Sequence, residues 1–362
     1  MDLTSLSLEQ KVGQLFFIGI PGPELDAPTR ELLDTVRPGG VCLFARNIKS
    51  REQTRKLNDD LTRYLANPLI SVDQEGGLVD RLRRIMTPLP AAGLLKSVED
   101  VQTLGRIVGE ELSILAFNMD FAPVVDVVTE ERGKVSNGLF NRPFGRSVAD
   151  VVELAGAFND EIRGHGILSC MKHFPGYGAT RVDSHEELPV VEISETEFNK
   201  IDLEPYRQLL PKADSVMIAH STYPNVRLQE RDQSGKLLPS SLSKAFVTTL
   251  LREGLGFDRL VVTDDLEMGA IMNTYGIGEA CKMAVLAGCD MLAICADPGR
   301  IVEGYQAVLA AAQGGVISED RLNASMARIA KTKASVVDRY PFDEARLDAL
   351  SAETADLVAR VS

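Results

Sequence analysis

The chain has 362 residues and a formal net charge of −13, with 44% hydrophobic and 25% charged residues. This composition supports a large hydrophobic core and is typical of a soluble globular protein. The acidic excess, with no basic run to offset it, argues against nucleic acid or a membrane surface as partner, since both favour clustered Lys and Arg.

The cysteines and the N-terminal segment indicate the compartment. The five cysteines are odd in number, form no C-x-x-C pair and lie mostly among apolar neighbours, which predicts reduced, buried thiols. The N-terminal segment lacks a basic lead and has only a short apolar run, so it does not resemble a secretory signal. No run approaches the length of a transmembrane helix. We therefore expect a soluble, cytoplasmic protein.

Short apolar runs alternate with longer amphipathic runs along the chain. Eight runs have the continuous apolar character of strands buried on both faces, namely residues 14–20, 40–44, 69–72, 118–122, 168–171, 215–219, 260–263 and 291–295. Between them, apolar residues recur at spacings of three and four, which predicts helices such as residues 51–66, 101–116, 148–163, 195–210, 242–253 and 278–286.

Eight such repeats favour an α/β fold, a (β/α)8 TIM-type barrel that forms a single domain. An open, doubly wound sheet is the main alternative, but no glycine-rich dinucleotide fingerprint follows the first predicted strand. No linker or low-complexity stretch divides the chain. We predict a barrel domain over residues 1–335 and a short C-terminal helical tail, residues 336–362, packed on the barrel.

Polar residues lie at the ends of five consecutive predicted strands, from the third to the seventh. In chain order they are Asp73 and Glu75, Asp126, Lys172 and His173, His220, and Asp264 and Asp265. In a barrel these positions converge on the C-terminal face, where the active sites of this fold are built. The pattern therefore predicts a functional site at that face.

Each carboxylate has a simpler explanation as a helix cap, because Asp accepts hydrogen bonds from free backbone N–H groups. Alternatively, Asp264 in "VVTDDLEMGAI" projects into the barrel mouth as a nucleophile or a metal ligand. Asp73 in "SVDQEGG" would then hold sugar hydroxyls, which donate to an ionised carboxylate. Arg81 either reaches the same mouth or lies on the surface of a helix.

The segment "KHFPGYGATRVDSHEELP", residues 172–189, is too rich in Gly and Pro to form a regular element. A loop of this length is usually functional or disordered. Lys172 and His173 supply hydrogen-bond donors suited to a hydroxyl-rich ligand. His185 would titrate near neutral pH and act as a general acid and base, with Asp183 orienting its ring. A solvated polar loop is the alternative.

A metal-dependent enzyme is a further possibility. Acidic residues at barrel strand ends can hold Mg²⁺ or Mn²⁺ through oxygen ligands, and Asp73, Glu75, Asp264 and Asp265 would be the ligands. The sequence has no H-E-x-x-H spacing and no phosphate loop of the G-x-x-x-x-G-K-[ST] type. We expect neither a metal nor another cofactor.

Seven motifs, in order, resemble the single-domain β-N-acetylhexosaminidases of glycoside hydrolase family 3: "VDQEGG", "APVVDV", "NRPFGRS", "KHFPGYGAT", "DSHEELP", "MIAHSTYP" and "VVTDDLEMGAI". The resemblance covers about residues 8–334 and implies a retaining hydrolase with a covalent glycosyl-enzyme intermediate. By motif, Asp264 is the nucleophile, His185 the acid/base and Asp183 its partner. The resemblance also implies that the N-acetylglucosamine ring is held by Asp73, Arg81, Arg142, Lys172 and His173, with His220 and Met268 nearby.

Three positions depart from the family pattern, which commonly has His at Tyr177, Arg at Leu78 and Asp at Ala179. These departures affect the preference for the leaving group and the support of the acid/base loop. The resemblance predicts hydrolysis of terminal, non-reducing β-linked N-acetylglucosamine from a small carbohydrate or muropeptide, as in peptidoglycan recycling of the cell wall. A phosphorylase with the same residues, a broader-specificity β-glycosidase and a catalytically silent sugar-binding barrel are the alternatives.

Overall fold

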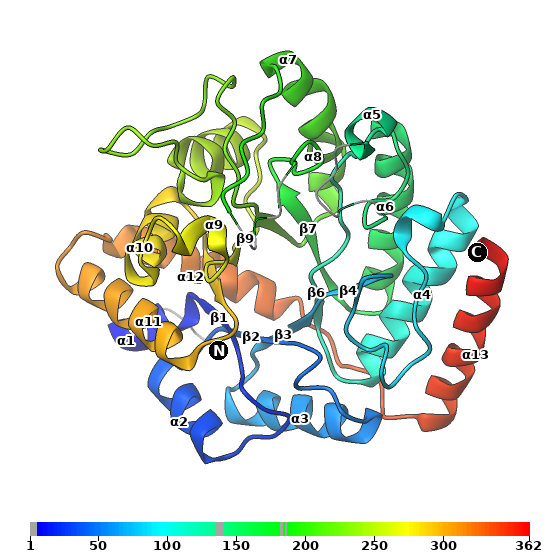
Figure 1. Cartoon of the computed structure of the whole chain (residues 1–362). Helices are drawn as coiled ribbons and strands as arrows, with labels where there is room; N and C mark the ends of the chain where they lie inside the picture. Colours follow the sequence, from blue (N-terminus) through cyan, green and yellow to red (C-terminus); the bar gives the residue numbers. More distant parts are fainter. Residues whose placement is uncertain (1–5, 135–138, 140, 182–183, 185–186) are drawn as a thin grey trace.

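A computed structural model of the chain describes residues 6–134, 139, 141–181, 184 and 187–362. Eight parallel strands close into a barrel in the order β1-β10-β9-β8-β7-β6-β3-β2, and helices surround it (Figure 1). The barrel strands are β1 Phe16–Gly19, β2 Gly40–Leu43, β3 Leu69–Val72, β6 Met119–Asp120, β7 Leu168–Phe174, β8 Ser215–Ile218, β9 Leu260–Asp265 and β10 Met291–Ile294. The predicted TIM-type barrel is therefore confirmed, and the open-sheet alternative is wrong.

The remaining elements cover the barrel or its rim. A short hairpin, β4 Gln74–Gly76 and β5 Val79–Asp80, follows β3. The α-helices are α1 Leu8–Gln14, α2 Ala27–Val36, α3 Arg51–Tyr64, α4 Val98–Ile114, α5 Glu130–Gly133, α6 Val148–Gly164, α7 Glu195–Glu197, α8 Glu204–Leu209, α9 Gly269–Met272, α10 Ile277–Ala287, α11 Pro298–Gln313, α12 Glu319–Ala334 and α13 Glu344–Val361. The 3-10 helices are η2 Ala92–Leu94, η4 Leu210–Lys212 and η5 Ser240–Leu242, and the π-helices are η3 Phe198–Asp202 and η6 Ala245–Gly254. None of the described helices is both long and apolar enough to cross a membrane.

The barrel strands form where the sequence is continuously apolar, because both of their faces are buried. Every residue of β1, "FFIG", is buried, and the Phe17 ring lies 5.1 Å from the ring of Phe121 inside the barrel. Strand β7 extends to Phe174 and so includes Lys172 and His173, which the sequence pattern placed just after the strand. The sugar-binding candidates of this strand are therefore fixed by the barrel itself.

Two of the predicted α-helices are not regular α-helices in the structure. Residues 195–210 form α7, the π-helical η3, α8 and the 3-10 turn η4 in succession, and Pro205 lies in the first turn of α8. Proline has no N–H to continue the hydrogen bonds of a preceding helix, which explains a break at this point. Residues 245–254 form the π-helical η6 where an α-helix was expected over residues 242–253.

The C-terminal helix α13 lies along the outside of α4 (Figure 1). Arg346 in α13 pairs with Glu110 in α4, with Nε and Oε2 2.7 Å apart, and Arg106 of α4 pairs with Glu353. The predicted helix in the tail is thus present, while the domain boundary at residue 335 stays a prediction.

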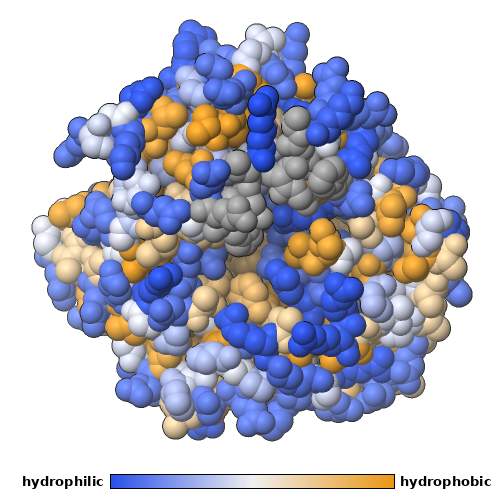
Figure 2. Space-filling model, in the orientation of Figure 1, coloured by the Kyte–Doolittle hydropathy of each residue, from blue (hydrophilic) through white to orange (hydrophobic). Residues whose placement is uncertain are grey.

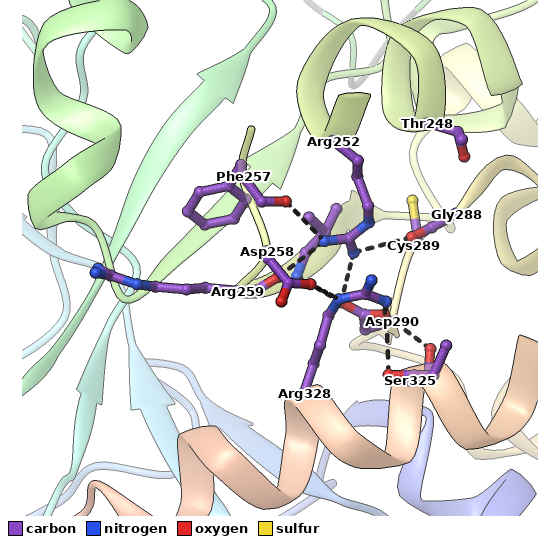
Figure 3. Close-up of polar contacts among 12 residues, drawn as sticks. Thr248, Arg252, Phe257, Asp258, Arg259, Gly288, Cys289, Asp290, Ser325 and Arg328 are labelled. Carbon is purple, nitrogen blue, oxygen red and sulfur yellow. Dashed lines mark hydrogen bonds and ion pairs between the residues drawn. The ribbon is translucent and has the colours of Figure 1, made fainter. Parts of the chain in front are cut away.

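A buried carboxylate, that of Asp290, lies at the N-terminal end of the barrel, directly before β10 (Figure 3). Asp290 accepts hydrogen bonds from Arg252 Nη2 at 2.6 Å, Ser325 Oγ at 2.8 Å and Arg328 Nη1 at 3.3 Å. Its partners come from η6 and α12, so a single side chain links two covering helices to the barrel.

Candidate active site

The C-terminal ends of the strands surround a pocket of about 380 Å³. Figure 2 shows a hollow near the centre of the molecule, bordered by both hydrophilic and hydrophobic side chains. Most of the predicted site residues line the pocket, namely Asp73, Arg81, Arg142, Lys172, His173, Asp264 and Met268. Residues that lie up to about two hundred positions apart in the sequence therefore meet at the face where barrel enzymes build their sites.

A network of buried charges lies on one side of the pocket. Lys172 Nζ lies 2.7 Å from Asp73 Oδ1 and 2.5 Å from Glu75 Oε1. Arg142 donates from Nε and Nη2 to the two oxygens of Glu75, at 2.8 and 2.9 Å. Glu75 thus holds both cations in place, while Asp73 retains an oxygen, Oδ2, that lies 3.7 Å from Arg81.

The charges in this network stabilise each other. Burial raises the pKa of Glu75, but the attraction of Arg142 and Lys172 outweighs it and holds the pKa well below its usual range. Burial likewise lowers the pKa of Lys172, and the charges of Asp73 and Glu75 outweigh it, so that the pKa rises. Glu75, Arg142 and Lys172 are therefore ionised at neutral pH. The pocket offers both donors and acceptors to a polyhydroxylated ligand.

The imidazole of His173 is oriented by Asp126, which lies beyond the end of β6. Nδ1 of His173 is 2.7 Å from Asp126 Oδ2, so Nδ1 carries a proton and donates it in a hydrogen bond to the carboxylate. The other ring nitrogen, Nε2, lies 3.4 Å from Arg142 Nη2. Asp126 therefore fixes which edge of His173 faces the pocket.

Asp264 and Asp265 end strand β9, and both line the pocket. Burial raises the pKa of Asp264, but His173, His220 and the backbone N–H of Asp265 outweigh it, so the pKa falls below its ordinary value. That N–H donates to Asp264 Oδ1 at 2.8 Å. Burial raises the pKa of Asp265 to about 7. Asp264 is therefore an ionised carboxylate at the pocket wall, the form that a nucleophile requires.

His220 supports the end of β9. Its Nε2 lies 3.0 Å from the carbonyl oxygen of Asp265, and its Nδ1 lies 2.7 Å from Ser241 Oγ. Burial lowers the pKa of His220. Both ring nitrogens are engaged within the protein, and its predicted contact with substrate stays a prediction.

Arg81 and Met268 lie at the edge of the pocket. The guanidinium of Arg81 lies 5.7 Å from the centroid of the Phe44 ring, close to Asp73. Met268 is the residue before α9 and is buried. Leu78 is 77% exposed and lines the same pocket, so the rim offers an apolar surface beside the charged wall.

The predicted acid/base pair lies outside the described residues. Nothing in the geometry therefore bears on Asp183 or His185 themselves, and their roles stay predictions. Ser184, between them in the sequence, is described, is buried and lines the pocket.

The sequence interpretation did not assign site roles to Asp126 or Tyr177, and it considered Glu75 only as a metal ligand. The position of Asp126 after a strand was a signal for it. Glu75 also follows a strand, but that position did not reveal its role, because its partners are contributed by β7 and by the segment before α6. Among the residues that the structure describes, no group of three or more His, Cys, Asp and Glu side chains is arranged to hold a metal ion.

Residues 7–332 match the family model described as the glycosyl hydrolase family 3 N-terminal domain. A β-hexosaminidase of Psychromonas ingrahamii is 35% identical over 291 residues, which cover 77% of this chain and 82% of the relative. A family 3 β-N-acetylglucosaminidase from Paenibacillus superposes with a TM-score of 0.86 at 33% identity, over 98% of this chain and 69% of that one. A β-N-acetylhexosaminidase from Beutenbergia cavernae gives a TM-score of 0.82 at 28% identity, over 91% of this chain and 99% of that one.

Proposed function

The chain belongs to glycosyl hydrolase family 3 and is a glycoside hydrolase, and we propose that it removes terminal, non-reducing β-linked N-acetylglucosamine with retention of configuration. The β-hexosaminidase and β-N-acetylglucosaminidase names of its relatives support this substrate class. The observation that carries the proposal is the ionised Asp264 at the wall of a pocket that is rich in hydrogen-bonding groups.

In the proposed reaction, Asp264 attacks the anomeric carbon and forms a covalent glycosyl-enzyme intermediate. His185, protonated and oriented by Asp183, donates a proton to the leaving oxygen. Water then hydrolyses the intermediate, with His185 acting as the base, as microscopic reversibility requires.

Hydrogen bonds from the charged wall would hold the sugar ring. Asp73 retains acceptor capacity for sugar hydroxyls beside Lys172, and the oriented ring of His173 faces the pocket. The pocket volume of about 380 Å³ is at the lower end of the range for ligand pockets, which suits a single sugar residue. Arg81 and Arg142 complete this side, and Met268 and His220 would lie close to the ring.

We further propose that the physiological substrate is a small peptidoglycan fragment, cleaved in the cytoplasm during cell-wall recycling. The leaving group would extend past the rim of the pocket, where the exposed Leu78 offers it an apolar contact. A phosphorylase is the second candidate. A histidine that acts as base carries no negative charge, unlike a carboxylate, and would not repel a phosphate acceptor.

The test is the release of nitrophenol from nitrophenyl β-N-acetylglucosaminide, with and without phosphate and with a chelator. We expect Asp264→Asn to lower kcat/KM by more than about 1,000-fold and His185→Ala to lower it by about 100-fold or more. Asp258→Asn is the control, because Asp258 is an exposed carboxylate just before β9, at the end of the barrel opposite the pocket. Its kcat/KM should match that of the wild type. The first product seen by NMR should be the β-anomer.

Other outcomes point elsewhere. Full activity of Asp264→Asn would overturn its assignment as nucleophile, and an α-anomeric first product would overturn retention. A sugar phosphate product in phosphate buffer would identify a phosphorylase. Loss of activity with the chelator would favour the metal-dependent alternative.

A further inference from the structure

Ser184 is held from both sides at the pocket. Its N–H donates to the hydroxyl oxygen of Tyr177 at 3.0 Å, and its carbonyl oxygen accepts from the N–H of Ala270 at 3.0 Å. Both distances are those of ordinary hydrogen bonds, and Ser184 is only 5% exposed. The backbone at this position is therefore fixed by two groups that belong to different parts of the barrel face.

Tyr177 is itself anchored to the sugar-binding side of the pocket. Its N–H donates to Asp126 Oδ1 at 2.6 Å, and its ring centroid lies 5.6 Å from that of His173. Asp126 also orients His173 through Nδ1. The tyrosine and the histidine therefore share one carboxylate, and the tyrosine hydroxyl has little freedom to move relative to the sugar site.

The second group that holds Ser184 belongs to the nucleophile side of the pocket. Ala270 lies in α9, which begins directly after Met268 and follows the strand that ends with Asp264 and Asp265. Ser184 thus connects β6 and β7, through Tyr177, to the segment that follows β9.

We propose that Tyr177 is a positioning residue for proton transfer to the leaving group. Its hydroxyl fixes Ser184, and Ser184 stands between Asp183 and His185 in the sequence, so that the hydroxyl determines how efficiently this pair acts. The inference rests on the proposed function, in which His185 is the acid and base. Tyr177 acts through the hydrogen bond that its oxygen accepts from the N–H of Ser184.

The expected effect follows from the steep dependence of general acid catalysis on geometry. A positioned acid contributes about 100- to 10,000-fold to the rate, and a displacement of about 1 Å can remove much of that. The contribution is large for a basic leaving group and small for one that leaves readily as an anion. Removal of the Tyr177 hydroxyl should therefore lower kcat/KM more for a substrate with a basic leaving group than for one whose leaving group departs readily as an anion.

The experiment compares Tyr177→Phe with the wild type on phenyl and 2,4-dinitrophenyl β-N-acetylglucosaminides. We expect kcat/KM to fall by about 10- to 100-fold for the phenyl substrate and by less than about 2-fold for the dinitrophenyl substrate. Because His185 also serves as base in the second step, kcat for the dinitrophenyl substrate should fall, and azide should restore it by intercepting the intermediate.

Tyr206→Phe is the matched control. Tyr206 is also buried and lies against Phe174 of β7, with ring centroids 5.0 Å apart, but its hydroxyl has no hydrogen-bond partner in the described part of the chain. Both substrates should react with this variant as with the wild type.

Two results would overturn the inference. An equal loss for both substrates would show general damage to the pocket, and no loss for either would show that the hydroxyl is not needed. Failure of the wild type to hydrolyse either substrate would instead overturn the proposed function, and the inference with it. Retained hydrolysis of the dinitrophenyl substrate also shows that Tyr177→Phe is folded.

Discussion

Asp264 and Asp265 are neighbours of the same residue type, yet their surroundings shift their pKa values in opposite directions. Both are penalised by burial, but only Asp264 has enough positive charge and N–H donation around it to stay ionised. Asp265 has Glu267 nearby, which opposes its ionisation. Opposite shifts in adjacent carboxyl groups are a common sign of divided roles in an active site. The environment therefore selects the nucleophile, which the "DD" pair alone does not identify.

The raised pKa of Asp265 predicts a pH dependence of stability. With a folded pKa of about 7, Asp265 keeps a proton in the folded state between about pH 4 and pH 7 that it loses in the unfolded state. As the pH rises from 4 to 7, the free energy of unfolding should therefore fall by about 1.4 kcal/mol per pH unit because of this group. Above pH 7 the contribution of Asp265 should be constant.

Asp265→Asn tests this prediction, because Asn keeps an oxygen that can accept the Glu267 N–H and carries no titratable proton. The free energy of unfolding of the variant relative to the wild type should rise from pH 4 to pH 7 and then level off. Urea unfolding followed by circular dichroism at several pH values measures it, since the chain has no tryptophan. A difference that does not change with pH would contradict the raised pKa.

At the residue scale, the sequence indicated which residues line the pocket better than it indicated which of them contact one another. Asp73, Lys172, His173 and Asp264 all line the pocket, as their positions at strand ends suggested. The role of Glu75 was not predictable, because its partner Arg142 is 67 residues away in the sequence. Only the closed barrel brings these groups within hydrogen-bonding distance.

At the scale of elements, the segment after β7 begins as a well-packed turn. The N–H of Gly176 donates to the His173 carbonyl at 2.9 Å, and the Tyr223 hydroxyl donates to the Gly176 carbonyl at 2.8 Å. Thr180 Oγ1 donates to the Tyr177 carbonyl at 2.9 Å. The Gly and Pro content correctly indicated an irregular segment, but composition does not reveal how many of its backbone groups find partners.

Gly178 lets this turn approach the segment that follows β6. A Cβ atom at this position would lie 2.1 Å from the carbonyl oxygen of Val127, which is too close for any side chain. We expect Gly178→Ala to displace the turn that carries Tyr177. The variant should lose about 1–3 kcal/mol of stability and have a lower kcat/KM on the phenyl substrate.

Gly22→Ala is the control, because no atom lies within 4 Å of a Cβ at that position. Its free energy of unfolding should stay within about 0.5 kcal/mol of the wild type. Chemical unfolding and phenyl glycoside hydrolysis measured on both variants separate the two cases. If Gly178→Ala is as stable and as active as Gly22→Ala, the turn is not constrained by this contact.

At the scale of the whole molecule, the order of elements was predictable and the irregularities were not. Eight continuous apolar runs give eight strands because strands buried on both faces need apolar residues at every position. The π-helical turns of η3 and η6 depend on how each helix fits against its neighbours, which no local pattern reports. The hairpin β4–β5 was likewise not anticipated from "QEGGLVD".

The two ends of the barrel have different tasks, because enzymes of this fold carry the active site at the C-terminal face while the N-terminal face contributes to stability. Asp290 is fully buried at that N-terminal end and is bound by Arg252 of η6 and by Ser325 and Arg328 of α12 (Figure 3). Its backbone N–H donates to the Val261 carbonyl of β9 at 2.8 Å. Its side chain accepts from the Val261 N–H at 3.1 Å. The side chain therefore links η6 and α12 to strand β9.

We expect Asp290→Ala to lower the free energy of unfolding by about 3–5 kcal/mol, because it leaves the partly buried guanidinium groups of Arg252 and Arg321 without their counter-ion. Asp258→Ala removes the other carboxylate paired with Arg328 and is the matched control, since the Asp258 side chain is 80% exposed. Its loss should stay below about 1 kcal/mol. Urea unfolding of both variants gives the two values, and kcat/KM of folded Asp290→Ala should equal that of the wild type at low temperature. Equal losses for the two variants would contradict a special role for the buried carboxylate, and a reduced kcat/KM would show that the two ends of the barrel are coupled.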